Sequence, residues 1–152
     1  MEYKKLKNKI SKQLKSFTNN KKKILGNEGS LLELWKLCVK ISEGERCIIC
    51  GGYTESKLGK KIVDCHHIIR RSQGAALKYD VRNGVPLCKG CHHNRIHDGD
   101  PIATEKVLEY NGESRWNYLK SRKNEIVKMN RYNVEEIFEG LCEYYEMVEN
   151  EL

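Results

Sequence analysis

Residues 64–99, together with Cys47-Ile48-Ile49-Cys50 upstream, form the stretch that decides the fold of this chain. The stretch begins Asp64-Cys65-His66-His67-Ile68-Ile69-Arg70-Arg71 and continues further on as Arg82-Asn83-Gly84-Val85-Pro86-Leu87-Cys88-Lys89-Gly90-Cys91-His92-His93-Asn94-Arg95-Ile96-His97. All five histidines and five of the seven cysteines lie between positions 47 and 97. This concentration of sulfur and imidazole groups predicts two metal sites.

The first predicted site consists of four cysteines. Cys47–Cys50 and Cys88–Cys91 are both Cys-x2-Cys pairs, and at this spacing a tight turn brings two thiolates onto one tetrahedral ion. Four unrelated buried thiols are the alternative, but two matched pairs make it weak. We therefore predict a structural Zn²⁺, because four thiolates leave no open position for a substrate.

The second predicted site consists of histidines. His93 and His97 are four residues apart, so on an α-helix both rings would project from one face. His66 and His67 are neighbours in a β-rich stretch, where successive side chains point to opposite sides. One of these two can therefore join the metal while the other faces a water as general base.

In their order along the chain, these motifs resemble the HNH endonuclease family. The chain shows Cys-x2-Cys, His-His-Ile-Ile, an Asn, Pro-Leu-Cys-x2-Cys-His and a final His over about residues 30–100. Within that family it is most similar to phage HNH proteins of the NinG/Rap recombination type. The resemblance implies an α+β fold with a small ββα-metal (treble-clef) core.

The resemblance also implies a role for each matched residue. His66 becomes a metal ligand, His67 the general base, Asn83 the residue that holds the loop, and His97 the last ligand. The third ligand is open: helical spacing favours His93, whereas the register counted from Asn83 favours His92. We predict His93, with His92 as the alternative. The family uses Mg²⁺ or Mn²⁺, although imidazole ligands would also suit Zn²⁺ or Ni²⁺.

The charge is unevenly distributed along the chain. Residues 1–40 hold 11 Lys/Arg against 3 Asp/Glu, residues 41–97 hold 10 against 5, and residues 98–152 hold 7 against 13. The basic part predicts nucleic acid as the partner, and the resemblance implies that this is DNA, duplex or branched. Four arginines beside the histidines are predicted to contact phosphates: Arg70, Arg71, Arg82 and Arg95.

Hydrophobic periodicity outlines three segments. Residues 1–29 are predicted as a basic helix, which contacts DNA, docks on the core or lies on a membrane surface, followed by a flexible connection over residues 19–23 and 26–29. Residues 30–102 form the predicted nuclease core, whose first helix starts at Ser30 with a capping box to Glu33. Residues 103–152 form an acidic helical extension whose last helix has a stripe with Val134, Phe138 and Leu141.

Together these observations predict a metal-dependent DNA endonuclease, with phage recombination or DNA processing as its setting. The alternative is a non-catalytic, zinc-stabilised nucleic-acid-binding module, which would leave the histidines without a role. No apolar run long enough to span a membrane occurs, and cysteines assigned to metal suit a reducing cytoplasm, that of the host cell for a phage protein. We expect a monomer or homodimer.

Overall fold

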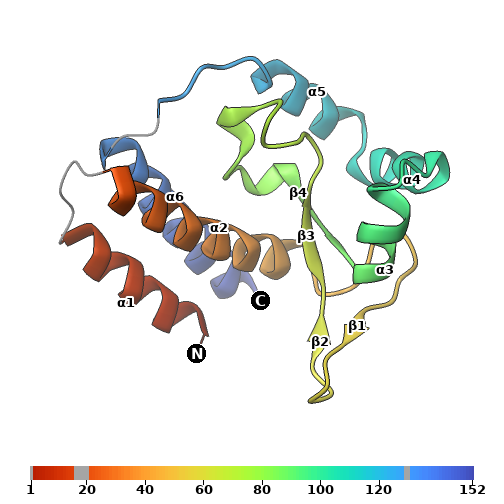
Figure 1. Cartoon of the computed structure of the whole chain (residues 1–152), viewed down its shortest axis with the longest axis horizontal. Coiled ribbons are helices and arrows are strands. Elements are labelled where there is room, and N and C mark those ends of the chain that lie inside the picture. Colours follow the sequence, from red (N-terminus) through yellow and green to blue (C-terminus); the bar gives the residue numbers. More distant parts are fainter. Residues whose placement is uncertain (1, 16–20, 129–130) are drawn as a thin grey trace.

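This computed structural model describes residues 2–15, 21–128 and 131–152, and over these ranges the chain forms a small α+β unit with two antiparallel sheets (Figure 1). The α+β class expected from the sequence is confirmed. The helices are α1 (Glu2–Lys15), α2 (Lys21–Glu43), α3 (Lys89–Cys91), α4 (Pro101–Asn111), α5 (Glu113–Arg122) and α6 (Arg131–Glu151). The strands are β1 (Thr54–Glu55), β2 (Lys61–Ile62), β3 (Asp64–His67) and β4 (Gly84–Leu87).

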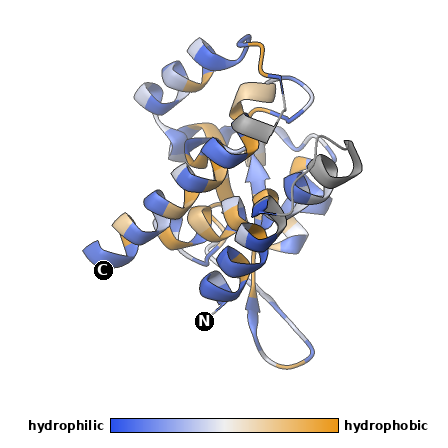
Figure 2. Ribbon diagram, turned by 90° about the vertical axis from the view of Figure 1, so that its left-hand side faces the viewer, coloured by the Kyte–Doolittle hydropathy of each residue, from blue (hydrophilic) through white to orange (hydrophobic). Residues whose placement is uncertain are grey.

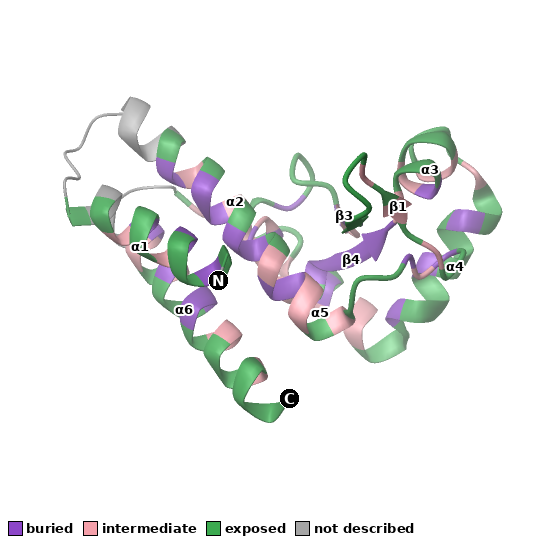
Figure 3. Cartoon of the chain, turned by 90° about the horizontal axis from the view of Figure 1, so that it is seen from below, coloured by how far each residue is buried: buried purple, intermediate pink, exposed green. Residues whose placement is uncertain are grey.

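Helices α1, α2 and α6 pack together on one side of the β3–β4 pair and form the larger hydrophobic core (Figures 1 and 3). Each helix turns its apolar stripe inward, as helical periodicity predicts. The buried side chains of this core include Tyr3, Leu6 and Ile10 of α1, Leu31, Leu34, Trp35, Cys38 and Val39 of α2, and Val134, Phe138, Leu141 and Cys142 of α6. Of the three alternatives for the N-terminal helix, docking on the core is therefore the one observed.

Helix α2 begins at Lys21, so the predicted helix start at Ser30 and the flexible connection over residues 21–23 and 26–29 are wrong. The Ser30 hydroxyl does not begin the helix; it donates to the carbonyl of Gly26 within it, at 3.4 Å. Asn27 and Ser30 are both buried. The two glycines in this part of α2 lower its intrinsic helix propensity, and burial against the rest of the fold supplies the stability that the helix needs. Residues 19–20 of the predicted connection lie outside the described residues.

Strands β3 and β4 form the antiparallel pair at the centre, and β4 is buried along its whole length (Figure 3). His66 pairs with Val85 and His67 with Gly84. A Cβ on Gly84 would lie 2.5 Å from Val39 Cγ2 and 2.6 Å from Trp35 Cζ2. Only glycine therefore lets β4 approach α2 this closely.

Helices α3, α4 and α5 lie on the other side of the β3–β4 pair (Figure 1). Helix α4 is capped by Asp100, whose Oδ1 accepts hydrogen bonds from the amides of Ile102 and Ala103. A second, smaller core joins this side to β4 and to the first cysteine pair through Ile49, Val85, Leu87, Ala103 and Val107. Among the described helices, none combines the length and apolar character needed to cross a membrane.

Candidate metal centres

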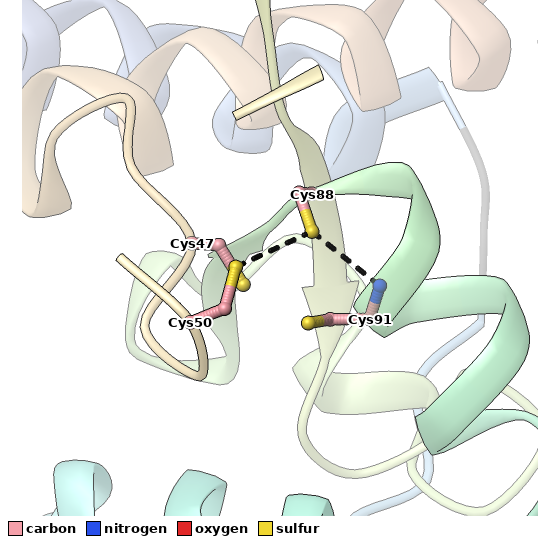
Figure 4. A group of neighbouring side chains, drawn as sticks. All are labelled: Cys47, Cys50, Cys88 and Cys91. Carbon is pink, nitrogen blue, oxygen red and sulfur yellow. Dashed lines mark hydrogen bonds between the residues drawn. The ribbon is translucent and has the colours of Figure 1, made fainter. Parts of the chain in front are cut away.

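Four cysteines from two separate segments converge beside β4 (Figure 4). Cys47 and Cys50 lie in the turn that follows α2, whereas Cys88 caps the start of α3 and Cys91 is its last residue. Their sulfur atoms all lie within 4.8 Å of one another. The predicted Cys-x2-Cys pairs therefore form a single cluster, which is compatible with a structural metal such as zinc.

Local backbone geometry shapes each cysteine pair. The amide of Gly52 donates to Cys50 Sγ and the amide of Cys91 donates to Cys88 Sγ, both at 3.4 Å. Gly51 adopts a φ of +74°, which suits a residue without a side chain. Burial raises the pKa of Cys91 to about 12, so adjacent thiolates need a cation to offset their charge.

Three histidines form a second cluster. His66 comes from β3. His92 is the first residue of the segment His92–Ile96 (η3), and His97 directly follows that segment. One ring nitrogen from each of the three lies within 4.8 Å of the others. The ring centroids of His92 and His97 are 4.4 Å apart, and those of His66 and His92 are 5.3 Å apart.

The segment His92–Ile96 is a π-helical turn, and this decides which histidines meet. The amide of His97 donates to the carbonyl of His92 at 3.1 Å, an i→i+5 hydrogen bond. Residues five apart therefore face the same side here. Our preference for His93 assumed α-helical periodicity, which this segment does not have, and the structure groups His92 with His66 and His97. The five-residue separation of His92 and His97, one more than an α-helical face favours, is the sequence signal for such a turn.

His93 lies in a neighbouring group with Asp64 and His92. The Nε2 atom of His93 is 3.6 Å from Asp64 Oδ2, and the same oxygen accepts from His92 Nδ1 at 3.0 Å. This contact leaves His92 Nε2 as the nitrogen that can bind a cation. Asp64 thus orients a histidine of the cluster, as carboxylates commonly do behind metal-binding imidazoles.

His67 lies on the other face of β3 and does not join the histidine cluster. Its ring stacks on Trp35, with centroids 4.0 Å apart and planes within 8°, and its Nε2 is 2.8 Å from the carbonyl oxygen of Lys78. Because a carbonyl only accepts, Nε2 carries the proton and Nδ1 keeps the lone pair. Burial lowers the pKa of His67 to about 4, so the ring is neutral near pH 7.

Asn83 is fully buried and ties together the loop between β3 and β4. Its Oδ1 accepts from the amide of Ile69 at 2.8 Å, while its Nδ2 donates to the carbonyls of Ile69 and Leu77 at 2.9 and 3.1 Å. The loop so fastened includes Arg70 and also Lys78, whose carbonyl holds His67.

The four arginines predicted to contact phosphates differ in their surroundings. Arg70 and Arg71 are exposed. The pKa of His97 is lowered first by burial, then by the imidazoles of His92 and His93, and next by the positive charge of the nearby Arg70. The Arg82 guanidinium stacks 3.4 Å from the centroid of the Tyr118 ring. Arg95 Nε donates to Asp100 Oδ2 at 2.9 Å. Arg70 and Arg71 are therefore the two that are freest to meet a ligand.

Comparisons of the chain with protein-family models, curated proteins and solved structures find no match.

Proposed function

We propose that this protein is a metal-dependent DNA endonuclease of the HNH type. The observation that carries the proposal is the convergence of His66, His92 and His97 on one face of β3, with a histidine of fixed tautomer, His67, at the next position of the same strand. A packed core seldom gathers imidazoles in this way, because each polar ring costs free energy unless it is partnered.

The donor set fits a divalent cation at the histidine cluster. His66, His92 and His97 would hold it, with Asp64 orienting His92, and the exposed position of His97 leaves one side of the cluster open to a substrate. Imidazole donors suit Zn²⁺, Ni²⁺ or Mn²⁺, whereas the family resemblance implies Mg²⁺ or Mn²⁺. When bound, the ion would supply charge neutralisation at the scissile phosphate and at the leaving oxygen.

His67 would take the proton from the attacking water through Nδ1. The Lys78 carbonyl and the Trp35 ring hold the imidazole in one orientation, which a general base requires. Its low pKa makes it neutral near pH 7 but weakens it as a base. A phosphate bound nearby would raise that pKa toward the working pH, because negative charge favours the imidazolium.

The four-cysteine cluster would hold one structural Zn²⁺ and take no part in the reaction. DNA is the proposed polymer because Lys and Arg exceed Asp and Glu over residues 1–97. Arg70 is the best-placed contact for the phosphates beside the histidine cluster. A zinc-stabilised module that binds nucleic acid without cleaving it remains the rival function.

A cleavage assay on linear, branched and single-stranded DNA, with Mg²⁺, Mn²⁺, Ni²⁺ or Zn²⁺, tests the proposal. His67→Ala should lose about 10²-fold or more in rate yet bind DNA and the divalent ion like wild type. His92→Ala should lose affinity for the ion, whereas His93→Ala, its neighbour in sequence, serves as the matched control and should retain it.

Two results would contradict the proposal. A wild-type protein that cleaves none of these substrates with any of the four ions would leave the binding module as the better description. A metal defect in His93→Ala but not in His92→Ala would show that the grouping of His66, His92 and His97 is not the binding site.

A further inference from the structure

The β1–β2 hairpin projects away from the rest of the chain (Figures 1 and 2). Thr54 pairs with Ile62 and Glu55 with Lys61. The tip is closed by hydrogen bonds from the Ser56 amide to the Lys60 carbonyl, at 2.9 Å, and from the Lys60 amide to Ser56 Oγ, at 3.0 Å. The hairpin is therefore an ordered two-stranded ribbon.

The base of the hairpin is fastened beside the four-cysteine cluster. Thr54 Oγ1 accepts from the amide of Lys89 at 2.9 Å, and Lys89 lies between Cys88 and Cys91. At the other end, β2 continues through Val63 directly into β3. The hairpin is thus held in line with the strand that carries His66.

The exposed side chains of the hairpin are mainly cationic and apolar. Lys57, Lys60 and Lys61 are exposed, and within the described part of the chain none of them forms an ion pair. Leu58, at the tip, is 85% exposed, and no core of this protein uses it. The Lys61 ammonium lies 5.0 Å from the centroid of the Tyr53 ring, which keeps that cation on the hairpin surface.

We propose that the β1–β2 hairpin binds a groove of double-stranded DNA, with its lysines on the phosphates and Leu58 against the bases. This inference rests on the proposed function, because it assigns the substrate its duplex form. The major groove admits a two-stranded β-ribbon, and apolar side chains at such tips contact or wedge against bases. Charge complementarity favours DNA over an apolar protein partner.

The position of the hairpin also sets where on the duplex it binds. His66 lies five residues beyond Lys61, which corresponds to about 17 Å of extended chain at about 3.3 Å per residue. At about 3.4 Å per base pair along a duplex parallel to β3, Lys61 would contact DNA about five base pairs from the histidine cluster. The contact would lie on one side of the cleaved bond only.

Titration of a fluorescent linear duplex at several salt concentrations tests the proposal. The variant Lys57→Ala/Lys60→Ala/Lys61→Ala should reduce the salt slope of the association constant by up to about 2.7, since each phosphate contact contributes about 0.9. Lys4→Ala/Lys5→Ala/Lys9→Ala, on exposed positions of α1, removes the same charge and should change the slope by less than about 0.9, the contribution of one phosphate contact. Leu58→Ala should weaken binding without altering the slope, because an apolar contact releases no counterion.

Equal slope changes in the hairpin and α1 variants, or no duplex binding by the wild type, would overturn the proposal. An unchanged affinity in Leu58→Ala would overturn the placement of the tip within the groove. Hairpin-dependent duplex binding without cleavage would reject the nuclease and leave the hairpin contact standing. Cleavage with an unchanged slope would reject the hairpin contact alone.

Discussion

Replacing Asn83 by alanine should lower the free energy of unfolding by more than the loss of one short side chain would suggest. The side chain has no exposed surface and makes three hydrogen bonds to backbone groups, two to Ile69 and one to Leu77. After the substitution, the amide and the carbonyl of Ile69 both lose this partner inside the fold. The Leu77 carbonyl keeps the amide of Asp80, at 3.3 Å.

These contacts set the expected magnitude. A buried polar group left without a partner costs about 1–3 kcal/mol, so two such groups should lower the free energy of unfolding by about 2–6 kcal/mol. That is a large share of the roughly 5–15 kcal/mol that stabilises a domain of this kind. Urea denaturation followed by tryptophan fluorescence would measure the loss as a lower midpoint with an unchanged slope.

Asn111 provides the matched control. It is also buried, at 7% exposed, but within the described part of the chain neither atom of its side-chain amide has a hydrogen-bond partner. Asn111→Ala should therefore change the free energy of unfolding by less than about 1 kcal/mol, because it removes a polar group that gains nothing from burial. Equal losses of unfolding free energy in the two variants would refute the role of Asn83 in holding the loop between β3 and β4.

Three further predictions concern the rest of the fold. The purified protein should retain about one Zn²⁺ per chain through dialysis, and Cys88→Ser should lose both the ion and thermal stability. A wild-type protein that holds no zinc and melts at the same temperature as Cys88→Ser would contradict this. Gly84→Ala should cost about 1–3 kcal/mol in urea denaturation, because its Cβ would lie 2.6 Å from Trp35 Cζ2, whereas Gly90→Ala, with no neighbour within 4 Å, should cost nothing. Ile10→Ala should cost about 2–5 kcal/mol, and a loss below about 0.5 kcal/mol would mean that α1 does not pack on the core.

The features that sequence analysis predicted well depend on local patterns. A Cys-x2-Cys pair needs only a tight turn, so the pairing of Cys47 with Cys50 and of Cys88 with Cys91 followed from their spacing. The helices that contain Leu34 and Phe138 followed from their apolar stripes, and both side chains are buried. In each case the determinants lie within one or two turns of chain.

The features that sequence analysis missed depend on contacts between distant segments. Gly26 and Gly29 suggest a connection, but packing against the rest of the fold keeps them helical within α2. Helix α1 could not be assigned to DNA or to the core until α6 was placed, because Tyr3 stacks on Tyr145 with ring centroids 3.9 Å apart. The pairing of Asp64 with His92 likewise joins β3 to the π-helical turn that begins directly after Cys91.

The two candidate metal centres are coupled through that turn. Cys91 is followed directly by His92, so a metal held by the cysteines would fix the residue that begins the π-helical turn. The β3–β4 pair gives a second connection, because Cys88 follows β4 and His66 lies on β3, opposite Val85. A closed four-thiolate site binds its metal more persistently than an open histidine site. An ion at the histidine cluster would therefore be lost or exchanged while the fold persists, whereas loss of a metal from the cysteines would displace His92 and with it the histidine cluster.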